Sequence, residues 1–187
     1  MSTKLKSLDQ QVIVITGASS GIGLATAEAA AKKGAKLALA ARSEQTMNDV
    51  VARINDSGGE AIFVACDVAD RAQVESVAKA AVARFGRIDT WVNNAGIAIY
   101  GRLDEVTDED SRRLFETNFW GVVNGSLAAL PHLQENGGAL INLGSEVSDA
   151  VVPLLGMYSA SKHAVKGFTD SLRVEIEDVD KSPYRSR

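Results

Sequence analysis

Residues 11–23 read QVIVITGASSGIG, and this stretch decides the fold. Residues 11–16 are mostly apolar and β-branched, as in a strand buried on both faces of a parallel sheet. A glycine-rich turn follows at once, and from Gly21 an alanine-rich segment of helical pattern extends to about residue 33. Gly34 lies where a C-terminal cap is expected. The stretch therefore predicts a strand, a tight turn and a helix in direct succession.

The same alternation continues along nearly the whole chain. Further strands are expected at residues 36–41, 61–66, 88–93 and 139–143. Further helices are expected at residues 43–56, with Ser43 as N-cap, and at residues 70–85, 108–133 and 157–176. Strands alternating with helices at this spacing imply a parallel sheet with helices on both faces. The predicted fold class is a doubly wound α/β fold, in one domain over residues 1–187.

Composition and charge exclude several classes of protein. The chain has 187 residues, of which 45% are hydrophobic and 24% charged, enough for one domain with a substantial core. Its net charge of -4, without a basic cluster, argues against nucleic-acid binding. Short apolar runs predict no membrane span or signal peptide, and the lone Cys66 predicts neither a disulfide nor a metal site. We expect a cytoplasmic protein.

The turn after the first strand has the composition of a phosphate-binding loop. Glycines let backbone N–H groups and a helix N-terminus approach a diphosphate closely. The spacing is T-G-x-x-x-G-x-G, which resembles the cofactor-binding turn of the short-chain dehydrogenase/reductase family. A turn that uses glycine for steric reasons alone is the alternative, but the strand–turn–helix context favours the cofactor site. The candidate cofactor-binding residues here are Thr16, Gly17, Ser19, Ser20, Gly21, Ile22 and Gly23.

The end of the second strand indicates which dinucleotide is bound. An acidic residue there would bind the adenosine 2′-hydroxyl of NAD, whereas an arginine accommodates the 2′-phosphate of NADP. The strand ends in Ala41 and Arg42, with no carboxylate before Glu44. Arg42 is thus the predicted 2′-phosphate residue, although a solvated arginine at a strand end is common. NADP(H) is favoured over NAD(H).

Two further motifs resemble the same family. Asp67 and Val68 follow the third strand, where the family's aspartate contacts the adenine ring. Residues 93–96 read NNAG and match the family motif that supports the sheet and lines the cofactor site. The resemblance implies cofactor-binding roles for Asp67, Val68, Asn94, Ala95 and Gly96.

Tyr158 and Lys162 lie four residues apart and therefore on one face of the predicted last helix. A tyrosine hydroxyl is ordinarily a weak base, and an adjacent ammonium favours its phenolate form. Such a group can give or take the hydroxyl proton while a hydride moves. The Y-x-x-x-K pattern alone is often a surface pair, so its meaning depends on the residues that accompany it.

The accompanying residues complete the family's catalytic tetrad of Asn118, Ser145, Tyr158 and Lys162. Ser145 precedes Tyr158 by thirteen residues, and Ser148 is a nearer alternative that matches the spacing less well. By resemblance, Ser145 hydrogen-bonds the substrate oxygen and Asn118 holds a water that relays protons to Lys162. Lys162 also bonds the nicotinamide ribose, so Tyr158 and Lys162 belong to the cofactor site as well.

The resemblance covers about residues 10–177 and implies a Rossmann-type sheet of strand order 3-2-1-4-5. It implies NADP(H)-dependent hydride transfer between an alcohol and a carbonyl substrate, with Tyr158 as acid and base. It also implies a homo-oligomer formed through the helices at 108–133 and 157–176. Apolar residues at 151–155 suggest an apolar substrate, and Trp91 and Trp120 are expected to pack.

The match ends before the chain does. Family members continue with two more strands, whereas residues 180–187 read DKSPYRSR and predict no strand. We expect a C-terminally truncated domain whose fifth strand has an exposed edge, which invites aggregation. Loss of one base from codons for Pro-Val-Ser-Ile-Thr could give the last five residues, so the downstream DNA is expected to encode the missing strands. A catalytically weak or inactive dinucleotide-binding fragment is the alternative function.

Overall fold

The computed structural model describes residues 5–178, and one parallel sheet lies at its centre. Five strands are hydrogen-bonded in the order β3-β2-β1-β4-β5, and every pairing is parallel. They are β1 (Val12–Thr16), β2 (Lys36–Ala41), β3 (Glu60–Ala65), β4 (Thr90–Asn93) and β5 (Ala139–Asn142). The predicted fold class and strand order are confirmed.

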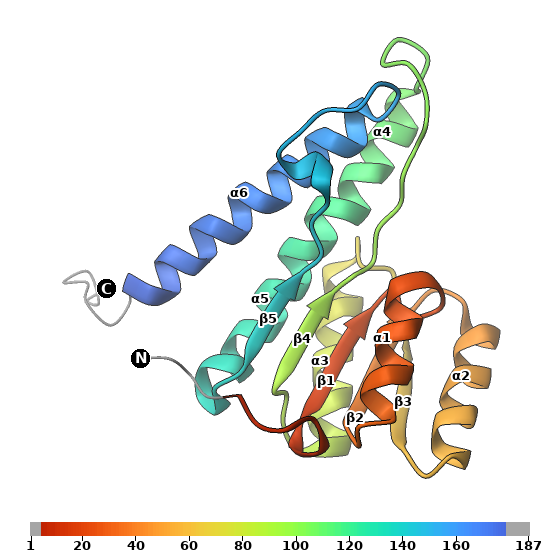
Figure 1. Ribbon diagram of the computed structural model, residues 1–187, viewed down its shortest axis with the longest axis vertical. Helices are drawn as coiled ribbons and strands as arrows, with labels where there is room; N and C mark the ends of the chain where they lie inside the picture. Colours follow the sequence, from red (N-terminus) through yellow and green to blue (C-terminus); the bar gives the residue numbers. More distant parts are fainter. Residues whose placement is uncertain (1–4, 179–187) are drawn as a thin grey trace.

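Helices cover both faces of this sheet. They are α1 (Gly21–Ala31), α2 (Glu44–Asp56), α3 (Arg71–Phe85), α4 (Asp108–Phe115), α5 (Gly121–Asn136) and α6 (Gly156–Asp178). In Figure 1, α1 and α2 lie in front of the sheet and α3 behind it, while α6 runs obliquely past β5. None of the helices within residues 5–178 is long and apolar enough to cross a membrane.

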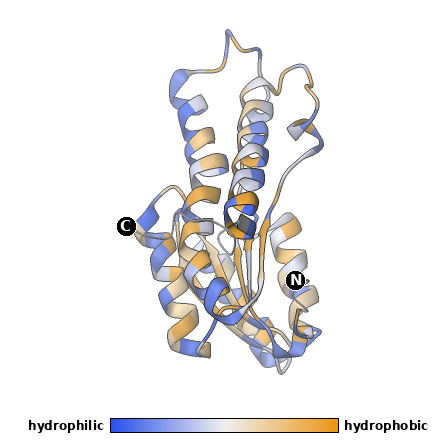
Figure 2. Cartoon of the chain, turned by 90° about the vertical axis from the view of Figure 1, so that its left-hand side faces the viewer, coloured by the Kyte–Doolittle hydropathy of each residue, from blue (hydrophilic) through white to orange (hydrophobic). Residues whose placement is uncertain are grey.

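The core consists of two apolar layers separated by the sheet. Every residue of β1 is buried, and its side chains alternate between the layers as the strand period requires. Ile13 and Ile15 pack toward α1 and α2, whereas Val14 packs toward α3 and α5 together with Trp91. Figure 2 shows this hydrophobic character concentrated on the strands, between helices that carry hydrophilic turns. Trp91 packs in the core as expected.

The helix predicted at residues 108–133 is not uniform. Between α4 and α5 lies a π-helical segment, η2 (Glu116–Trp120), in which Gly121 N–H donates to the carbonyl of Glu116, five residues back. Such wide turns occur mostly as single insertions in α-helices and often at functional sites. Trp120, at the end of this segment, packs edge-on against Phe119 and is 47% exposed.

The outer edge of β5 carries no partner strand among residues 5–178. Ile141 in this strand is 45% exposed, although a strand buried on both faces would cover it. The segment at residues 180–187, for which no strand was predicted, lies outside the described residues.

Candidate functional site

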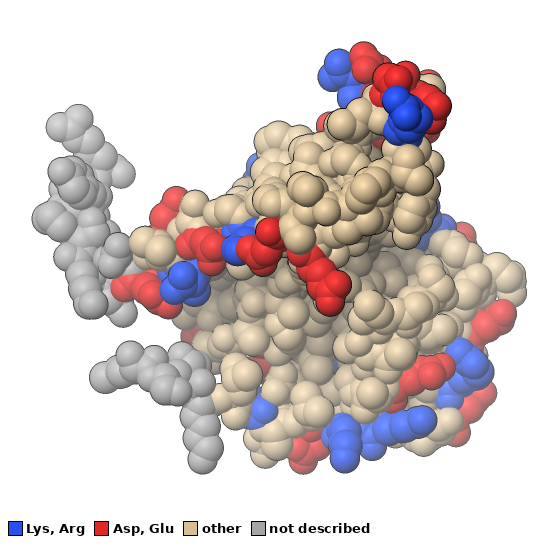
Figure 3. All heavy atoms as spheres, turned by 45° about the horizontal axis from the view of Figure 1, so that its top comes forward, with Lys and Arg blue, Asp and Glu red and all other residues tan. Residues whose placement is uncertain are grey.

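A cavity of about 640 Å³ lies at the carboxyl ends of the strands. In open α/β sheets this is the edge at which ligands bind, next to the point where strand order reverses. All predicted site residues line the cavity except Thr16, Gly23 and Asn118, which are buried. Figure 3 shows this side of the molecule hollowed below a projecting tip where acidic and basic side chains gather.

The glycine turn is held against the end of β4 by Asn94. The Asn94 amide donates to the carbonyl oxygens of Thr16 at 2.9 Å and Gly17 at 3.0 Å. In return, Thr16 Oγ1 accepts from the backbone N–H groups of Asn94 at 3.1 Å and Ala95 at 3.2 Å. A Cβ on Gly23 would lie 2.4 Å from both Asn94 Nδ2 and the Gly17 oxygen. Close packing therefore requires glycine at position 23. Thr16 and Gly23 support the turn on the side that faces away from the cavity.

The first turn of α1 opens into the cavity. Ser20, its N-cap residue, makes no side-chain capping hydrogen bond, which leaves N–H groups of the first turn available. Gly21 has φ +55°, and nothing lies within 4 Å of where its Cβ would be. Such a helix N-terminus fits a diphosphate, and the exposed Arg42 at the end of β2 lines the same cavity.

Asp67 is fixed by a partner from α4. Arg113 Nη2 donates to Asp67 Oδ2 at 2.6 Å, and Ala69 N–H donates to Oδ1 at 3.1 Å. Partial burial acts to raise the pKa of the Asp67 carboxyl, but these hydrogen bonds outweigh it and hold the pKa below its usual value. Arg113 also lines the cavity, and sequence reasoning missed it because its partner is distant in the chain.

Asn118 joins η2 to two neighbouring segments. Its side chain is fully buried and exchanges two hydrogen bonds of 2.8 Å with the backbone of Ile97. Its amide also lies 3.2 Å from Ser161 Oγ, which donates to the Tyr158 carbonyl at 2.7 Å. The π-helical segment is thereby tied to the turn of α6 that carries the tyrosine.

Tyr158 and Lys162 meet on the face of α6 that lines the cavity. Lys162 Nζ lies 5.8 Å from the centroid of the Tyr158 ring and donates to the Leu143 carbonyl at 2.8 Å. Lys162 is only 4% exposed, and burial lowers the pKa of its ammonium below the usual value. A positive charge is thus held beside the half-buried phenol of Tyr158.

Of the two candidate serines, Ser145 lies at the cavity and Ser148 supports it. Ser145 is the N-cap of a short 3₁₀ turn, η3 (Glu146–Ser148), and its Oγ accepts from Val147 N–H at 3.4 Å. Ser148 is buried, and its Oγ accepts from Ser145 N–H at 3.1 Å. The second serine therefore fixes the backbone of the first.

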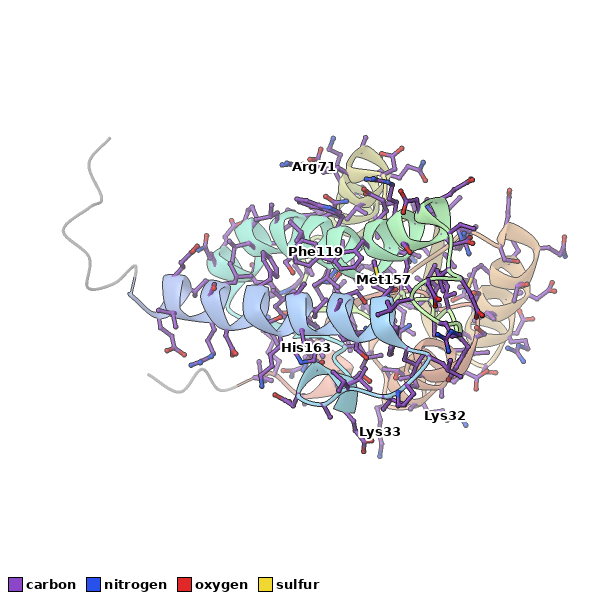
Figure 4. The ribbon with its side chains drawn as sticks, turned by 90° about the horizontal axis from the view of Figure 1, so that it is seen from above. Lys32, Lys33, Arg71, Phe119, Met157 and His163 are labelled. Carbon is purple, nitrogen blue, oxygen red and sulfur yellow. The ribbon has the colours of Figure 1, made fainter. Side chains whose placement is uncertain are left out.

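The helix pair that carries these residues is packed side by side. Figure 4 shows Phe119 facing α6, the helix that bears Met157 and His163. Phe119 meets Phe168 of α6 edge-on, with ring centroids 6.3 Å apart. Within residues 5–178 no group of three or more His, Cys, Asp or Glu side chains could hold a metal ion.

Comparison with known proteins gives a consistent result. A family model described as short chain dehydrogenase matches residues 11–180. An uncharacterized oxidoreductase of Bacillus subtilis, YxnA, is 48% identical over 176 residues, which cover 93% of this chain and 49% of the relative. The chain thus spans about half the length of that relative.

Two solved structures share the fold. An alcohol dehydrogenase from the archaeon Thermococcus sibiricus, complexed with 5-hydroxy-NADP, has a TM-score of 0.87 and 35% identity, covering 90% of this chain and 72% of that one. A short chain dehydrogenase/reductase from Burkholderia phymatum, in complex with NAD, has a TM-score of 0.90 and 36% identity, covering 94% of this chain and 63% of that one.

Proposed function

Because this chain belongs to the short-chain dehydrogenase family, we propose that it is an NADP(H)-dependent oxidoreductase acting on an alcohol or carbonyl substrate. One observation carries the proposal: a single cavity joins the glycine turn and Arg42 to Ser145, Tyr158 and Lys162. A phosphate-binding helix N-terminus and a tyrosine beside a buried ammonium are the two parts that hydride transfer with proton exchange needs. The presence of one continuous five-stranded sheet supports the prediction that the chain forms a single domain.

Each residue has a defined task in this proposal. The bound nicotinamide dinucleotide supplies or accepts the hydride. During reduction, the Tyr158 hydroxyl gives its proton to the substrate oxygen, and during oxidation it takes that proton back. The Ser145 hydroxyl donates a hydrogen bond to the same oxygen and stabilises its developing charge. Lys162 holds its ammonium beside the Tyr158 ring, and Asn118 positions this turn of α6 through Ser161.

Arg42 gives the proposed preference for NADP(H). Its guanidinium can bind a 2′-phosphate with charge-assisted hydrogen bonds, each worth about 1.5–3 kcal/mol. Arg42→Gln is therefore expected to weaken NADPH binding at least about tenfold and to leave NADH binding within about twofold. Equal losses for both dinucleotides would contradict this part of the proposal.

Two loops that continue beyond the cavity-lining residues Ala98 and Ser145 support an apolar substrate. Gly101 N–H of the first loop donates to the Leu154 carbonyl of the second at 3.0 Å. Tyr100, Val151 and Leu154 are 76%, 81% and 52% exposed. Leu154 has φ +67°, a conformation that costs energy for a side chain of this size. We infer that the loops are held in shape to present apolar side chains to a substrate.

Titration of the full chain with NADPH and NADH, alongside thermal melts, tests the function. Tighter binding of NADPH with a raised Tm is expected, followed by turnover with an apolar ketone or aldehyde. Tyr158→Phe provides the control, because it should keep dinucleotide binding and lose turnover. Binding without turnover for any carbonyl would favour the alternative of a dinucleotide-binding protein without catalysis. No binding by a cooperatively folded chain would overturn both.

Family resemblance also supports a homo-oligomer formed through the α4–α5 and α6 helices. Trp120 and Leu127 are 47% and 42% exposed on this helical layer. Sedimentation velocity of the full chain, compared with Trp120→Glu, tests this. A wild-type monomer at micromolar concentration would contradict it.

A further inference from the structure

A chain of side-chain hydrogen bonds runs from the core of the sheet to α6. The Trp91 indole N–H donates to Asn93 Oδ1 at 2.8 Å, and the Asn93 amide donates to Asn142 Oδ1 at 2.8 Å. The Asn142 amide in turn donates to Thr169 Oγ1 at 2.9 Å. The Thr169 hydroxyl donates to the Val165 carbonyl at 2.7 Å. The chain therefore connects β4 and β5 to one turn of α6.

The two ends of this chain fix the direction of every hydrogen bond in it. An indole N–H can only donate and a backbone carbonyl can only accept, so each amide presents its oxygen toward Trp91 and its nitrogen toward α6. Trp91 and Asn93 are buried, and hydrogen bonds aligned head to tail in such surroundings strengthen one another. The donor of Asn142 is thus directed at Thr169.

Thr169 lies on the face of α6 that carries the candidate catalytic residues. Tyr158, Lys162 and Thr169 are separated by four and seven residues, which places them on one side of an α-helix. Lys162 Nζ donates to the carbonyl of Leu143, which directly follows Asn142 at the end of β5. Two successive residues therefore hold α6 at two points about 10 Å apart along the helix axis.

The strand end is fixed more firmly than the helix. Leu143 is part of the sheet edge, because its N–H donates to the Asn93 carbonyl at 3.0 Å. By contrast, α6 packs mainly against α4, η2 and η3, and it runs obliquely past β5 (Figure 1). A helix held in this way can rotate about its axis or slide along it. The hydrogen bond between Asn142 and Thr169 opposes both motions, since it ties one point of α6 to the strand.

We propose that Asn142 and Thr169 are positioning residues that act on the site through Lys162. Their hydrogen bond keeps α6 at the rotation and height at which the Lys162 ammonium reaches the carbonyl of Leu143 and lies buried beside Tyr158. Without this bond, α6 separates from β5 more often and Lys162 meets solvent. The inference rests on the proposed function only for the task of Lys162 in turnover, because the contact itself requires neither dinucleotide nor substrate.

Thr169→Val tests this role, because it removes the hydroxyl and keeps the shape of the side chain. The rate at which acetic anhydride acetylates Lys162 in the ligand-free chain is measured by peptide mass spectrometry. Lys162 is buried, so the reagent reaches it mainly when α6 opens. Loss of one hydrogen bond should raise this rate about 3- to 10-fold. Thr169→Ser keeps the hydroxyl and should stay within about twofold of the wild type.

Cys66 provides an internal reference for global unfolding. It is buried directly after β3, at the opposite edge of the sheet from β5. Its alkylation by iodoacetamide in the same variants should change by less than about twofold. Equal acceleration at Lys162 and Cys66 would overturn the positioning role in favour of a general loss of stability. An unchanged rate at Lys162, or equal rates in Thr169→Val and Thr169→Ser, would overturn it as well.

Ser76→Ala is the matched control. Ser76 Oγ donates to the Ala72 carbonyl at 2.9 Å, the same bond to the preceding turn that Thr169 makes, but Ser76 lies exposed on α3. This variant should acetylate Lys162 at the wild-type rate, and an acceleration equal to that of Thr169→Val would contradict a specific role for the contact with Asn142.

A measurement on the wild type keeps the inference refutable if a variant does not fold. By NMR, the side-chain amide protons of Asn142 should exchange with solvent more slowly than those of Asn136, whose amide bonds the carbonyl of His132 in its own helix. Faster exchange at Asn142 would overturn the hydrogen-bond chain.

Turnover measures the consequence for the proposed reaction. The kcat should fall about 3- to 10-fold in Thr169→Val and recover in Thr169→Ser. An unchanged kcat with a more reactive Lys162 would overturn the link to the site. If NADPH binds while Lys162 and Cys66 respond alike, this inference fails and the proposed function stands. If Lys162 responds as expected and neither NADPH nor NADH binds, the proposed function fails and the positioning of Lys162 stands.

Discussion

The side-chain amide of Asn118 and the backbone of Ile97 hold each other through two reciprocal hydrogen bonds of 2.8 Å. The amide donates to the carbonyl and accepts from the N–H of the same residue, as a paired backbone segment would. These two hydrogen bonds fix the loop after β4 to η2.

Asn118→Ala should therefore destabilise the chain as well as the site. The N–H and carbonyl of Ile97 would lose their partners, at a cost of about 1–3 kcal/mol in the free energy of unfolding. Urea unfolding measures this. Asn136→Ala is the control, because Asn136 bonds only the carbonyl of His132 one helical turn away and should cost less than about 0.5 kcal/mol. Equal effects of the two changes would contradict the assigned role of the Ile97 contact.

Gly23→Ala should abolish dinucleotide binding. The new Cβ would lie 2.4 Å from Asn94 Nδ2 and from the Gly17 oxygen, which would force the turn and Asn94 apart. Gly167→Ala in α6 is the matched control, since nothing lies within 4 Å of its Cβ position and helix propensity favours alanine by about 1 kcal/mol. Calorimetric titration with NADPH checks binding, and a thermal melt shows whether the Gly167 variant gains stability. Retained affinity in Gly23→Ala would refute the packing argument.

Asp89 should make the free energy of unfolding of the chain depend on pH in the acidic range. Burial acts to raise its pKa, but hydrogen bonds from Val12 N–H, Lys6 and Arg87 hold the pKa of the carboxyl below its usual value. A carboxyl with a lowered folded-state pKa stabilises the fold above its unfolded-state pKa and loses that contribution as the pH falls through the folded-state value.

The free energy of unfolding should therefore fall below about pH 4 in the wild type. Asp89→Asn should be less stable at pH 7 and show a flatter decline between about pH 4 and 2. Urea unfolding at a series of pH values measures both curves. Parallel curves for the two proteins would show that Asp89 is not the responsible group.

Cys66 should react slowly with thiol reagents in the folded chain. Burial, with smaller contributions from Asp67 and Asp70, raises the pKa of its thiol to about 11, and the side chain is 3% exposed. The thiolate is the reactive form, so alkylation by iodoacetamide at pH 8 should be far slower than in urea. NADPH should slow it further, because Cys66 lines the cavity. Rapid labelling of the folded chain would contradict the burial of this residue.

The sequence predicts the parts of this molecule that depend on local pattern. The apolar run of β1, the glycine turn and the start of α1 follow from residues that are neighbours in the chain. The strand order was implied by the family resemblance of these motifs, and parallel strands with crossovers of one hand are consistent with it. The cavity then collects residues from the ends of adjacent strands, as expected for this class.

Long-range partners were not predictable in the same way. The pairing of Arg113 with Asp67 spans 46 residues, and nothing in the pattern around either residue indicates it. The π-helical turn was missed because apolar periodicity cannot distinguish an α-helix from one with a single wide turn. Its stabilising contacts come from Ile97 and Ser161, which belong to other segments.

The wide turn at η2 sets the rotational phase between the two helices that it joins. One residue of an α-helix advances the side chain by about 100°, so a one-residue deletion within Glu116–Trp120 would rotate α4 by that angle relative to α5. Gly121 would still face Val68, while Arg113 would turn away from Asp67. The length of this turn therefore determines that the contact of Arg113 with Asp67 and the contact of Gly121 with Val68 can form at the same time.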